Sequence, residues 1–291
     1  MIWDPPPVRR LLTYEEVLAE GTTRSKLRHG TDRDNFVRVI HGVYAEGPEP
    51  PTPFDVALAR MIRLRVPAFG LVGARLYDLD AVHDLEPTAV RRRRSEDLGG
   101  DPRGVRGVLC ASPLQVMIDL ATILDDDRWE QANESGLHKK LFTIDEELAL
   151  LETLEARRTP GVGRVRRVLA LRPPGAPPTE SRLETIAIQI ARKAEGVPEP
   201  TRQHVVYNRY GDFVARLDVS WPELRGFLEL DGLGHRGQPV YDATRESAVV
   251  AATGWLPNRM TWRESYNNAA WAARRMTEFI RQLRRRPLPG N

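Results

Sequence analysis

Two segments in the last third of the chain alternate between apolar and polar side chains. Residues 213–220 and 226–231 both show this period of two, which is typical of half-buried β-strands. A short turn joins them into a hairpin that places Asp218 across from Glu229. Asp231 follows on the same face as Glu229, because side chains two residues apart in a strand point the same way. The pattern predicts a ribbon with three carboxylates on one side.

Helices and further strands are predicted around this hairpin. Residues 181–195 carry apolar side chains at helical spacing, and the proline-containing run 196–200 ends that helix. Candidate strands follow over 203–207 and 256–261, and a helix begins at residue 242, before the last strand. A final helix follows that strand. This part of the chain therefore combines strands and helices.

The N-terminal pattern predicts a helix, a tight turn, a second helix and a two-stranded ribbon. Thr13-Tyr-Glu-Glu16 is a capping box, which satisfies free backbone amides at the start of a short helix. Thr22 is expected to cap a second short helix over 23–29, and strands follow over 36–40 and 43–44. This order is typical of a winged helix-turn-helix, whose second helix enters the DNA major groove.

Three basic side chains on the second short helix favour DNA binding. They are Arg24, Lys26 and Arg28. An ordinary helical hairpin capped by a β-ribbon would give a similar pattern of apolar positions. The basic helix and the ribbon after it favour the DNA-binding interpretation.

Two proline-rich stretches, 47–53 and 172–179, are stiff linkers that divide the chain. The segment between them is mainly helical, and Ser112-Pro-Leu-Gln115 starts one of its helices. The four-arginine run Arg91-Arg-Arg-Arg94 is interpreted as a solvated edge rather than a phosphate site. The predicted domains cover residues 1–48, 54–171 and 178–291.

Composition adds limits on compartment and partners. The 291 residues carry a net charge of +3 with a pI near 9.2, which permits nucleic-acid binding without proving it. A mean hydropathy of −0.44 and the lack of a long apolar run exclude a membrane span. The single cysteine, Cys110, excludes a disulfide within the chain and a cysteine-rich zinc site. With no signal-peptide pattern at the start, a cytoplasmic location is expected.

Crowded carboxylates on a ribbon repel one another unless a cation or a proton relieves them. Mg²⁺ is the natural cation, because it prefers hard oxygen ligands and keeps bound water. Next to a phosphodiester, such an ion would polarise the phosphoryl oxygen and lower the pKa of an attacking water. The alternative is a set of solvated carboxylates on an exposed ribbon. The apolar character of both strands favours the site.

Three residues after the hairpin have candidate roles near the carboxylates. His235 follows the strand end, where a general acid or base would lie. Arg245 either contacts a phosphate or pairs with Asp242 one turn away, and the ion pair is slightly favoured. Arg259, on the last strand, begins an arginine-rich and aromatic segment that suits a phosphate-facing surface. The alternative, favoured for the aromatic residues, is that they form the core face of the last helix and the arginines its solvated rim.

These residues together carry a family resemblance. They are Glu184, Gln203, Asp218, Glu229-Leu-Asp-Gly-Leu-Gly-His235, Asp242-x-x-Arg245, Gly254-Trp255 and Arg259. This pattern resembles the very-short-patch-repair (Vsr-like) endonuclease domains of the PD-(D/E)XK, restriction-endonuclease-like superfamily. The order of the three parts is similar to that of actinobacterial proteins with an AbiEi-type helix-turn-helix and middle domain, as in type IV toxin–antitoxin systems. Residues 111–120 are similar to the signature of that middle domain.

The resemblance implies an α/β fold with a mixed sheet flanked by helices, and Mg²⁺-dependent phosphodiester hydrolysis. It implies Asp218 and Glu229 as metal ligands, with Glu184 reaching the same metal from a helix. Ser181-Arg-Leu-Glu184 is also a capping box, which would explain that glutamate without catalysis. Where the superfamily commonly carries a lysine, this chain has Asp231. Vsr-like members also lack that lysine and rely on histidine, which raises the importance of His235.

Two functions therefore remain open. The first is a cytoplasmic DNA endonuclease, in repair or phage defence, whose N-terminal module positions the DNA. The second is an AbiEi-like regulator or antitoxin with a catalytically inactive nuclease fold and a possible toxin partner. The carboxylates favour the first, and the missing lysine favours the second.

Overall fold

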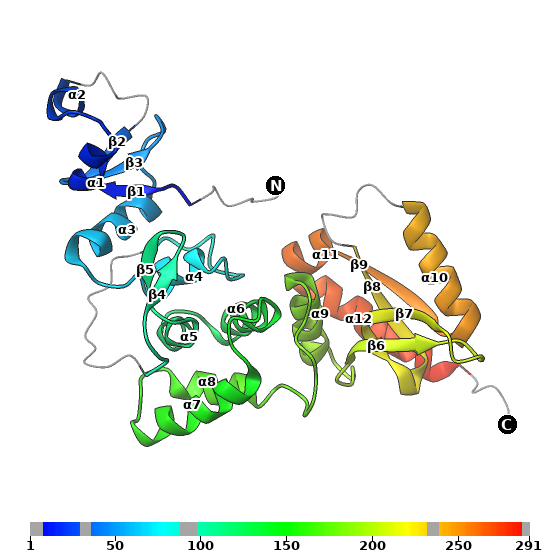
Figure 1. The fold of residues 1–291 in the computed structure, drawn as a ribbon. Helices are drawn as coiled ribbons and strands as arrows, with labels where there is room; N and C mark the ends of the chain where they lie inside the picture. Colours follow the sequence, from blue (N-terminus) through cyan, green and yellow to red (C-terminus); the bar gives the residue numbers. More distant parts are fainter. Residues whose placement is uncertain (1–7, 30–35, 88–97, 232–238, 287–291) are drawn as a thin grey trace. The chain divides into compact units, whose positions relative to one another are not determined.

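The computed structural model describes residues 8–29, 36–87, 98–231 and 239–286, and the rest of the chain is drawn in grey (Figure 1). The described residues form two compact units, of which the first ends at Leu171 and the second begins at Arg172. Both units mix helices with β-sheet, so the expected mixed α and β character is confirmed. Among the described residues, no helix combines the length and apolar composition needed to cross a membrane.

The first unit starts with a small antiparallel sheet and two short helices. Its elements are β1 (Leu11–Thr13), α1 (Tyr14–Ala19), α2 (Arg24–His29), β2 (Phe36–Ile40) and β3 (Val43–Glu46), with strand order β1-β3-β2. The capping box at Thr13 is confirmed, with hydroxyl and carboxylate both engaged. The cap of α2 is Thr23 rather than Thr22, because the amide of Lys26 donates to the Thr23 hydroxyl at 3.2 Å. The predicted ribbon is present and gains β1 as a third strand.

The rest of the first unit is mainly helical. It contains α3 (Pro53–Leu64), α4 (Gly70–Leu76), the β-hairpin of β4 (Arg103–Val105) and β5 (Val108–Cys110), α5 (Pro113–Leu120), α6 (Asp126–His138), α7 (Ile144–Ala156) and α8 (Val162–Leu169). One hydrophobic core joins this part to the N-terminal sheet, since Val43 and Ala45 cluster with Phe54 and Leu58. The predicted segments 1–48 and 54–171 thus share a single core.

The second unit is built on a four-stranded mixed sheet. Its elements are α9 (Arg182–Lys193), β6 (Thr201–Tyr207), β7 (Phe213–Trp221), the 3₁₀ turn η1 (Pro222–Leu224), β8 (Gly226–Asp231), α10 (Pro239–Thr253), β9 (Leu256–Thr261), α11 (Trp262–Asn267) and α12 (Ala269–Arg285). The strand order is β6-β7-β8-β9, with β8 and β9 parallel and the other pairs antiparallel. The predicted hairpin of β7 and β8 is confirmed.

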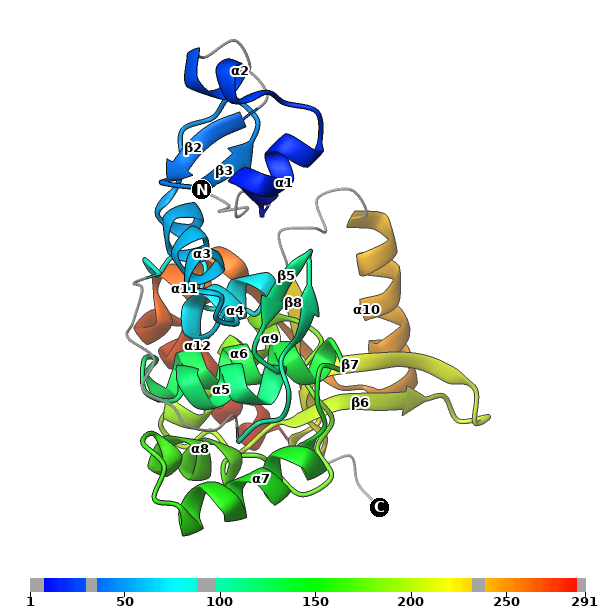
Figure 2. The same ribbon diagram turned by 60° about the vertical axis from the view of Figure 1, so that its left-hand side comes forward.

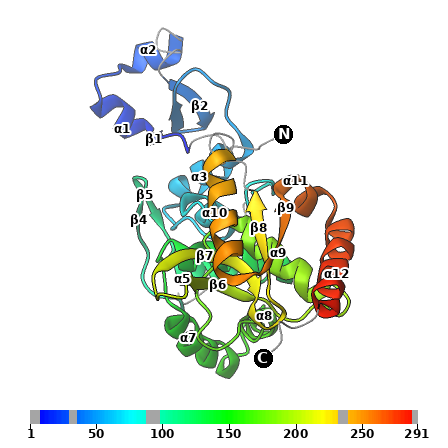
Figure 3. The ribbon, with the colours of Figure 1, turned by 90° about the vertical axis from the view of Figure 1, so that its right-hand side faces the viewer.

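Helices cover both faces of this sheet (Figure 3). On one face, Leu228 of β8 packs in a core with residues of α9 and α12. On the other, Phe227 packs with Val249 of α10. Gly226 allows α12 to approach β8 closely, because a Cβ there would lie 2.3 Å from a Leu283 methyl carbon. The two cores fix the sheet between the helices that carry the candidate site.

Candidate active site

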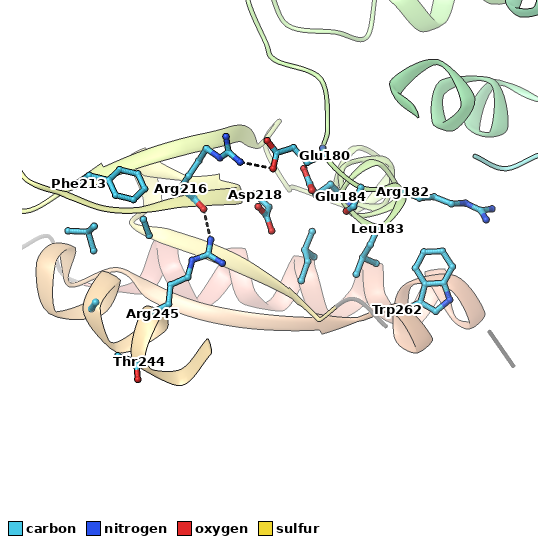
Figure 4. Close-up of a pocket in the computed structure, with 15 residues that line it drawn as sticks. Glu180, Arg182, Leu183, Glu184, Phe213, Arg216, Asp218, Thr244, Arg245 and Trp262 are labelled. Carbon is cyan, nitrogen blue, oxygen red and sulfur yellow. Dashed lines mark hydrogen bonds and ion pairs between the residues drawn. The ribbon is translucent and has the colours of Figure 1, made fainter. Parts of the chain in front are cut away.

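A cleft of about 890 Å³ lies in the second unit, where the start of α9 meets β7, α10 and α11 (Figure 4). Its polar and charged lining residues are Glu180, Ser181, Arg182, Glu184, Arg216, Asp218, Thr244 and Arg245. Apolar side chains complete the wall, with Phe213 at one end and Trp262 at the other in Figure 4. The cleft is therefore long, mixed in charge and bordered by aromatic rings.

The ladder between β7 and β8 sets the position of the two central carboxylates. Its last pair before the strands separate is Val219 with Leu228. Continued by one residue, this register places Asp218 opposite Glu229, as the alternation pattern predicted. Asp218 lines the cleft and lies between Glu184 and Arg245 in Figure 4. Burial raises the pKa of both Glu184 and Glu229, and the negative charge of Asp218 adds to each rise, so Asp218 lies within electrostatic range of both.

Glu184 is a buried carboxyl in the first turn of α9, with 4% of its surface exposed. Its Oε2 accepts hydrogen bonds from Gln203 Nε2 at 2.7 Å and from the amide of Glu180 at 3.0 Å. Burial raises the pKa of Glu184 to about 7, and Asp218 acts in the same direction. The hydrogen bonds oppose that rise. This carboxyl can hold or release a proton near neutral pH.

The start of α9 departs from the capping box that its sequence suggests. The Ser181 hydroxyl accepts the Glu184 amide at 3.2 Å, which is the first half of the box. The Glu184 carboxylate accepts the amide of Glu180 instead of closing the box on Ser181. The serine thus caps the helix while the glutamate contacts Gln203 and faces Asp218. The glutamate therefore does not fill the capping role that its position in the sequence suggested.

Gln203 is a member of this group that sequence reasoning noted only within the family pattern. It lies in β6 with φ of 50°, in the left-handed region that non-glycine residues rarely occupy. The β6–β7 register pairs Arg202 with Val219 and His204 with Leu217, which leaves Gln203 facing Asp218 across the strands. Its Oε1 is buried and has no hydrogen-bond partner among the residues that the structure describes. An unusual backbone and an unsatisfied buried atom are typical of functional sites.

Glu229 is half-buried on β8, and burial raises its pKa. The positive charges of Arg245 and Arg259 oppose that rise, whereas Asp218 and Glu246 add to it. Within the described part of the chain, its Oε1 is buried without a hydrogen-bond partner. Burying a carboxylate oxygen without a donor is costly unless a proton or a cation satisfies it. This oxygen therefore fits the requirement for a metal ligand.

The predicted metal-binding residues interact electrostatically, but they do not form a complete set of ligands around one metal position. Over residues 8–29, 36–87, 98–231 and 239–286, no group of three or more histidine, cysteine or acidic side chains is arranged to hold a metal ion. The structure brings Asp218 near both Glu184 and Glu229. Asp231 forms an ion pair with Arg259, whose Nε lies 3.7 Å from its Oδ2. The charge of Arg259 acts on Glu229 as well, so one arginine offsets charge beside both carboxylates of β8.

Arginines border the cleft. Arg245 donates from Nη2 to the backbone oxygen of Arg216, and its charge acts on Glu229. Arg216 Nη2 pairs with Glu180 Oε2 at 2.6 Å. Arg182 lies over two rings, with its guanidinium carbon 5.6 Å from the Trp262 centroid and 5.2 Å from that of Tyr266. Sequence reasoning identified Arg245 alone, and the position of Arg216 two residues before Asp218 was a usable signal.

The remaining predicted residues lie apart from the cleft or outside the described residues. Arg259 forms ion pairs with Glu246 at 3.0 Å and with Asp231 at 3.7 Å, and these carboxylates raise its pKa. Its guanidinium is thus engaged by acids rather than directed toward a phosphate. His235, the Asp242 side chain and the Arg91–Arg94 run fall outside the described residues.

The predicted DNA-binding side chains of the first unit lie on α2. Arg24 and Lys26 are exposed, and the Arg24 guanidinium carbon lies 6.0 Å from the Tyr14 ring centroid. Arg28 belongs to the same helix, and its side chain falls outside the described residues. The second short helix thus presents basic groups on its surface.

Comparisons with known proteins give no further assignment. No protein family, curated protein or solved structure matches this chain.

Proposed function

We propose that the second unit is a Mg²⁺-dependent DNA endonuclease and that α2 of the first unit contributes to duplex binding. The observation that carries the proposal is the position of Asp218. It lines a cleft bordered by Arg245, and its charge acts on two partly or fully buried carboxyls, Glu184 and Glu229. Such a charge pattern suits a cation bound beside a phosphodiester.

Each residue has a defined role under this proposal. Asp218, Glu229 and Glu184 hold the ion, and the unsatisfied oxygen of Glu229 supports that role. When bound, Mg²⁺ polarises a phosphoryl oxygen and lowers the pKa of water. Gln203 orients the Glu184 carboxyl through its 2.7 Å hydrogen bond. Arg245, next to the acids on the cleft wall, contacts the phosphate and offsets its charge.

A second candidate function is supported by the position of the missing lysine. Asp231 occupies it and pairs with Arg259, so this position is held by a salt bridge rather than a free cation. In that case the second unit is a catalytically inactive nuclease fold. The chain would then be an AbiEi-like DNA-binding regulator or antitoxin, with a toxin as its partner.

A DNA-nicking assay distinguishes the two functions. Purified full-length protein with Mg²⁺ is expected to nick or cut DNA across a panel of duplex and single-stranded substrates. Asp218→Ala is expected to abolish cutting and to leave mobility-shift affinity for DNA intact, because the Ala removes one ligand and no binding helix. Cutting that persists in this variant would place the activity elsewhere. Absence of cutting by the wild-type protein on every substrate would favour the regulator.

A further inference from the structure

The β6–β7 hairpin exposes an unusual group of aromatic side chains. Tyr207, Tyr210 and Phe213 have 58%, 73% and 65% of their surfaces exposed. The hairpin extends beyond the rest of the sheet (Figure 2). Single apolar side chains are common on protein surfaces, whereas clusters of them are rare. An exposed cluster therefore indicates an interaction site.

The tip that carries Tyr210 is held by a dense hydrogen-bond network. The Asn208 carbonyl side chain accepts the amides of Tyr210 at 2.8 Å and of Asp212 at 3.0 Å. The Asn208 amide side chain donates to Asp212 Oδ2 at 3.0 Å, and Gly211 takes a φ of 87° that the turn requires. The ring is therefore presented on a preorganised turn, which reduces the entropy lost on binding.

Positive charge accompanies these rings. The Arg209 guanidinium carbon lies 4.7 Å from the Tyr210 ring centroid, and its Nη2 donates to the tyrosine hydroxyl. Arg216 lies farther along the same ribbon, paired with Val205, and lines the cleft. Aromatic rings interleaved with arginines are typical of single-stranded nucleic-acid surfaces. An apolar protein partner would not require these charges.

The aromatic group is continuous with the candidate active site. Tyr207 pairs with Phe213 across the ribbon, and Phe213 itself lines the cleft that holds Asp218. A strand of DNA that enters the cleft from this end would pass the aromatic rings before it reaches the carboxylates. The surface and the site thus suit one extended ligand.

We propose that the β6–β7 hairpin binds unpaired nucleotides of DNA, whose bases stack on Tyr210 and Phe213 while Arg209 contacts the backbone phosphates. This inference rests on the proposed nuclease function and specifies its substrate class as DNA with unpaired bases beside the cleaved phosphate. Every base has a flat face that can stack on an aromatic ring, so the surface selects unpaired strands without reading sequence. In a continuous duplex the bases are stacked on each other and the rings have no such partner.

The test measures binding of full-length protein in EDTA, where no cutting occurs. The probes are a single-stranded oligonucleotide containing 2-aminopurine, whose fluorescence reports stacking, and the same sequence as a duplex. Phe213→Leu and Tyr210→Leu keep an apolar side chain but remove the ring, whereas Phe213→Tyr and Tyr210→Phe keep it. Each leucine variant is expected to weaken single-strand binding about tenfold, as the loss of one base–aromatic contact implies. The aromatic variants retain it.

Leu64→Ala is the matched control, because Leu64 is 71% exposed on α3 of the first unit. This variant is expected to leave the affinities for the single strand and for the duplex unchanged. Equal single-strand affinity for wild-type and leucine variants would overturn the inference. So would a leucine variant that instead dissociates an oligomer in analytical ultracentrifugation, since the hairpin would then contact a second copy of the chain.

Failure of the inference and failure of the proposed function are distinguishable in these measurements. If the leucine variants bind single-stranded DNA normally while Asp218→Ala abolishes cutting, the nuclease function is supported and the proposed role of the hairpin is wrong. If the leucine variants lose single-strand binding but no substrate is ever cut, the hairpin remains a nucleic-acid contact and the nuclease function falls. The side chains substituted at Tyr210, Phe213 and Leu64 are exposed, so melting temperatures close to the wild-type value are expected for these variants.

Discussion

The helices α7 and α9 begin with the same type of sequence, a hydroxyl residue followed three positions later by a glutamate. At α7 the pair closes a full capping box, with the Thr143 amide donating to Glu146 Oε2 at 2.7 Å and the Glu146 amide to Thr143 Oγ1 at 3.2 Å. Glu146 stays exposed. At α9 the box closes only from the Ser181 side, and Glu184 is buried against Gln203.

The difference shows that a local motif determines where the helix starts. It does not determine the burial or the hydrogen-bond partners of the glutamate carboxylate. At α7 the motif faces water, so capping is the whole role of the glutamate. At α9 the sheet places Gln203 next to the same position and Asp218 within electrostatic reach. The surroundings convert a helix cap into a buried acid with a pKa near 7. Matched substitutions at the two helices can separate these roles.

The largest expected difference between the two helices is in DNA cleavage. Glu184→Gln removes one proposed cation ligand and should lower cleavage by at least about tenfold, the scale for changes around a metal site. Glu146→Gln changes an exposed cap in the other unit and should leave cleavage unchanged. Initial rates on a nicked-plasmid assay with Mg²⁺ measure both. Equal rates for the two variants would remove Glu184 from the active site.

The next difference concerns stability and its dependence on pH. The pKa of Glu184 rises from 4.5 to about 7 in the folded protein, so the folded state prefers the protonated carboxyl. The free energy of unfolding therefore falls as pH rises from about 4.5 to about 7, and this loss is complete above pH 7. Glu184→Gln mimics the neutral acid and keeps an acceptor for Gln203 and for the Glu180 amide.

This variant should stabilise the second unit at pH 8 by up to about 3 kcal/mol, at about 1.4 kcal/mol per pKa unit, and have little effect at pH 4. Glu146→Gln, which loses only a charge near a helix start, should cost a few tenths of a kcal/mol. Chemical denaturation at the two pH values tests this. A destabilised Glu184→Gln protein at pH 8 would show that the charged carboxylate is the favoured form.

A smaller effect, on the affinity for duplex DNA, is expected from substitutions in the first unit. There, exposed charges rather than buried ones are proposed to bind DNA. Arg24→Ala with Lys26→Ala should weaken duplex binding severalfold and reduce the slope of log affinity against log salt by about 2, one for each phosphate contact. Arg166→Ala is the control, because Arg166 is also an exposed arginine of the first unit but lies on α8. An unchanged salt slope in the double variant would remove α2 from the duplex interface.

The sequence predicted the features that depend on neighbouring residues. The capping box at Thr13, the β7–β8 hairpin and the register of Asp218 with Glu229 all follow from short-range spacing. The sequence did not predict how the charge of Asp231 is balanced. That depends on α10 and β9, because Arg259 of β9 pairs with both Asp231 and Glu246 of α10.

Long-range contacts also explain the residues that were missed or given no role. Gln203, noted only within the family pattern, reaches Glu184 of α9 from β6, and only the fold brings the two together. Arg182 stacks on Trp262, which is eighty positions away in the chain. No periodicity in one segment can report contacts of this range. The sequence therefore indicated the chemistry of the site more reliably than its full membership.

The most direct test of the central claim is a calorimetric titration of the full-length protein with Mg²⁺ at pH 8, in parallel with Asp218→Asn and Glu146→Gln. The account predicts saturable binding by the wild-type protein and by Glu146→Gln, and its loss in Asp218→Asn. Wild-type protein that takes up no Mg²⁺, or an Asp218→Asn variant that binds it as tightly as wild type, would contradict the claim that these carboxylates hold a divalent cation.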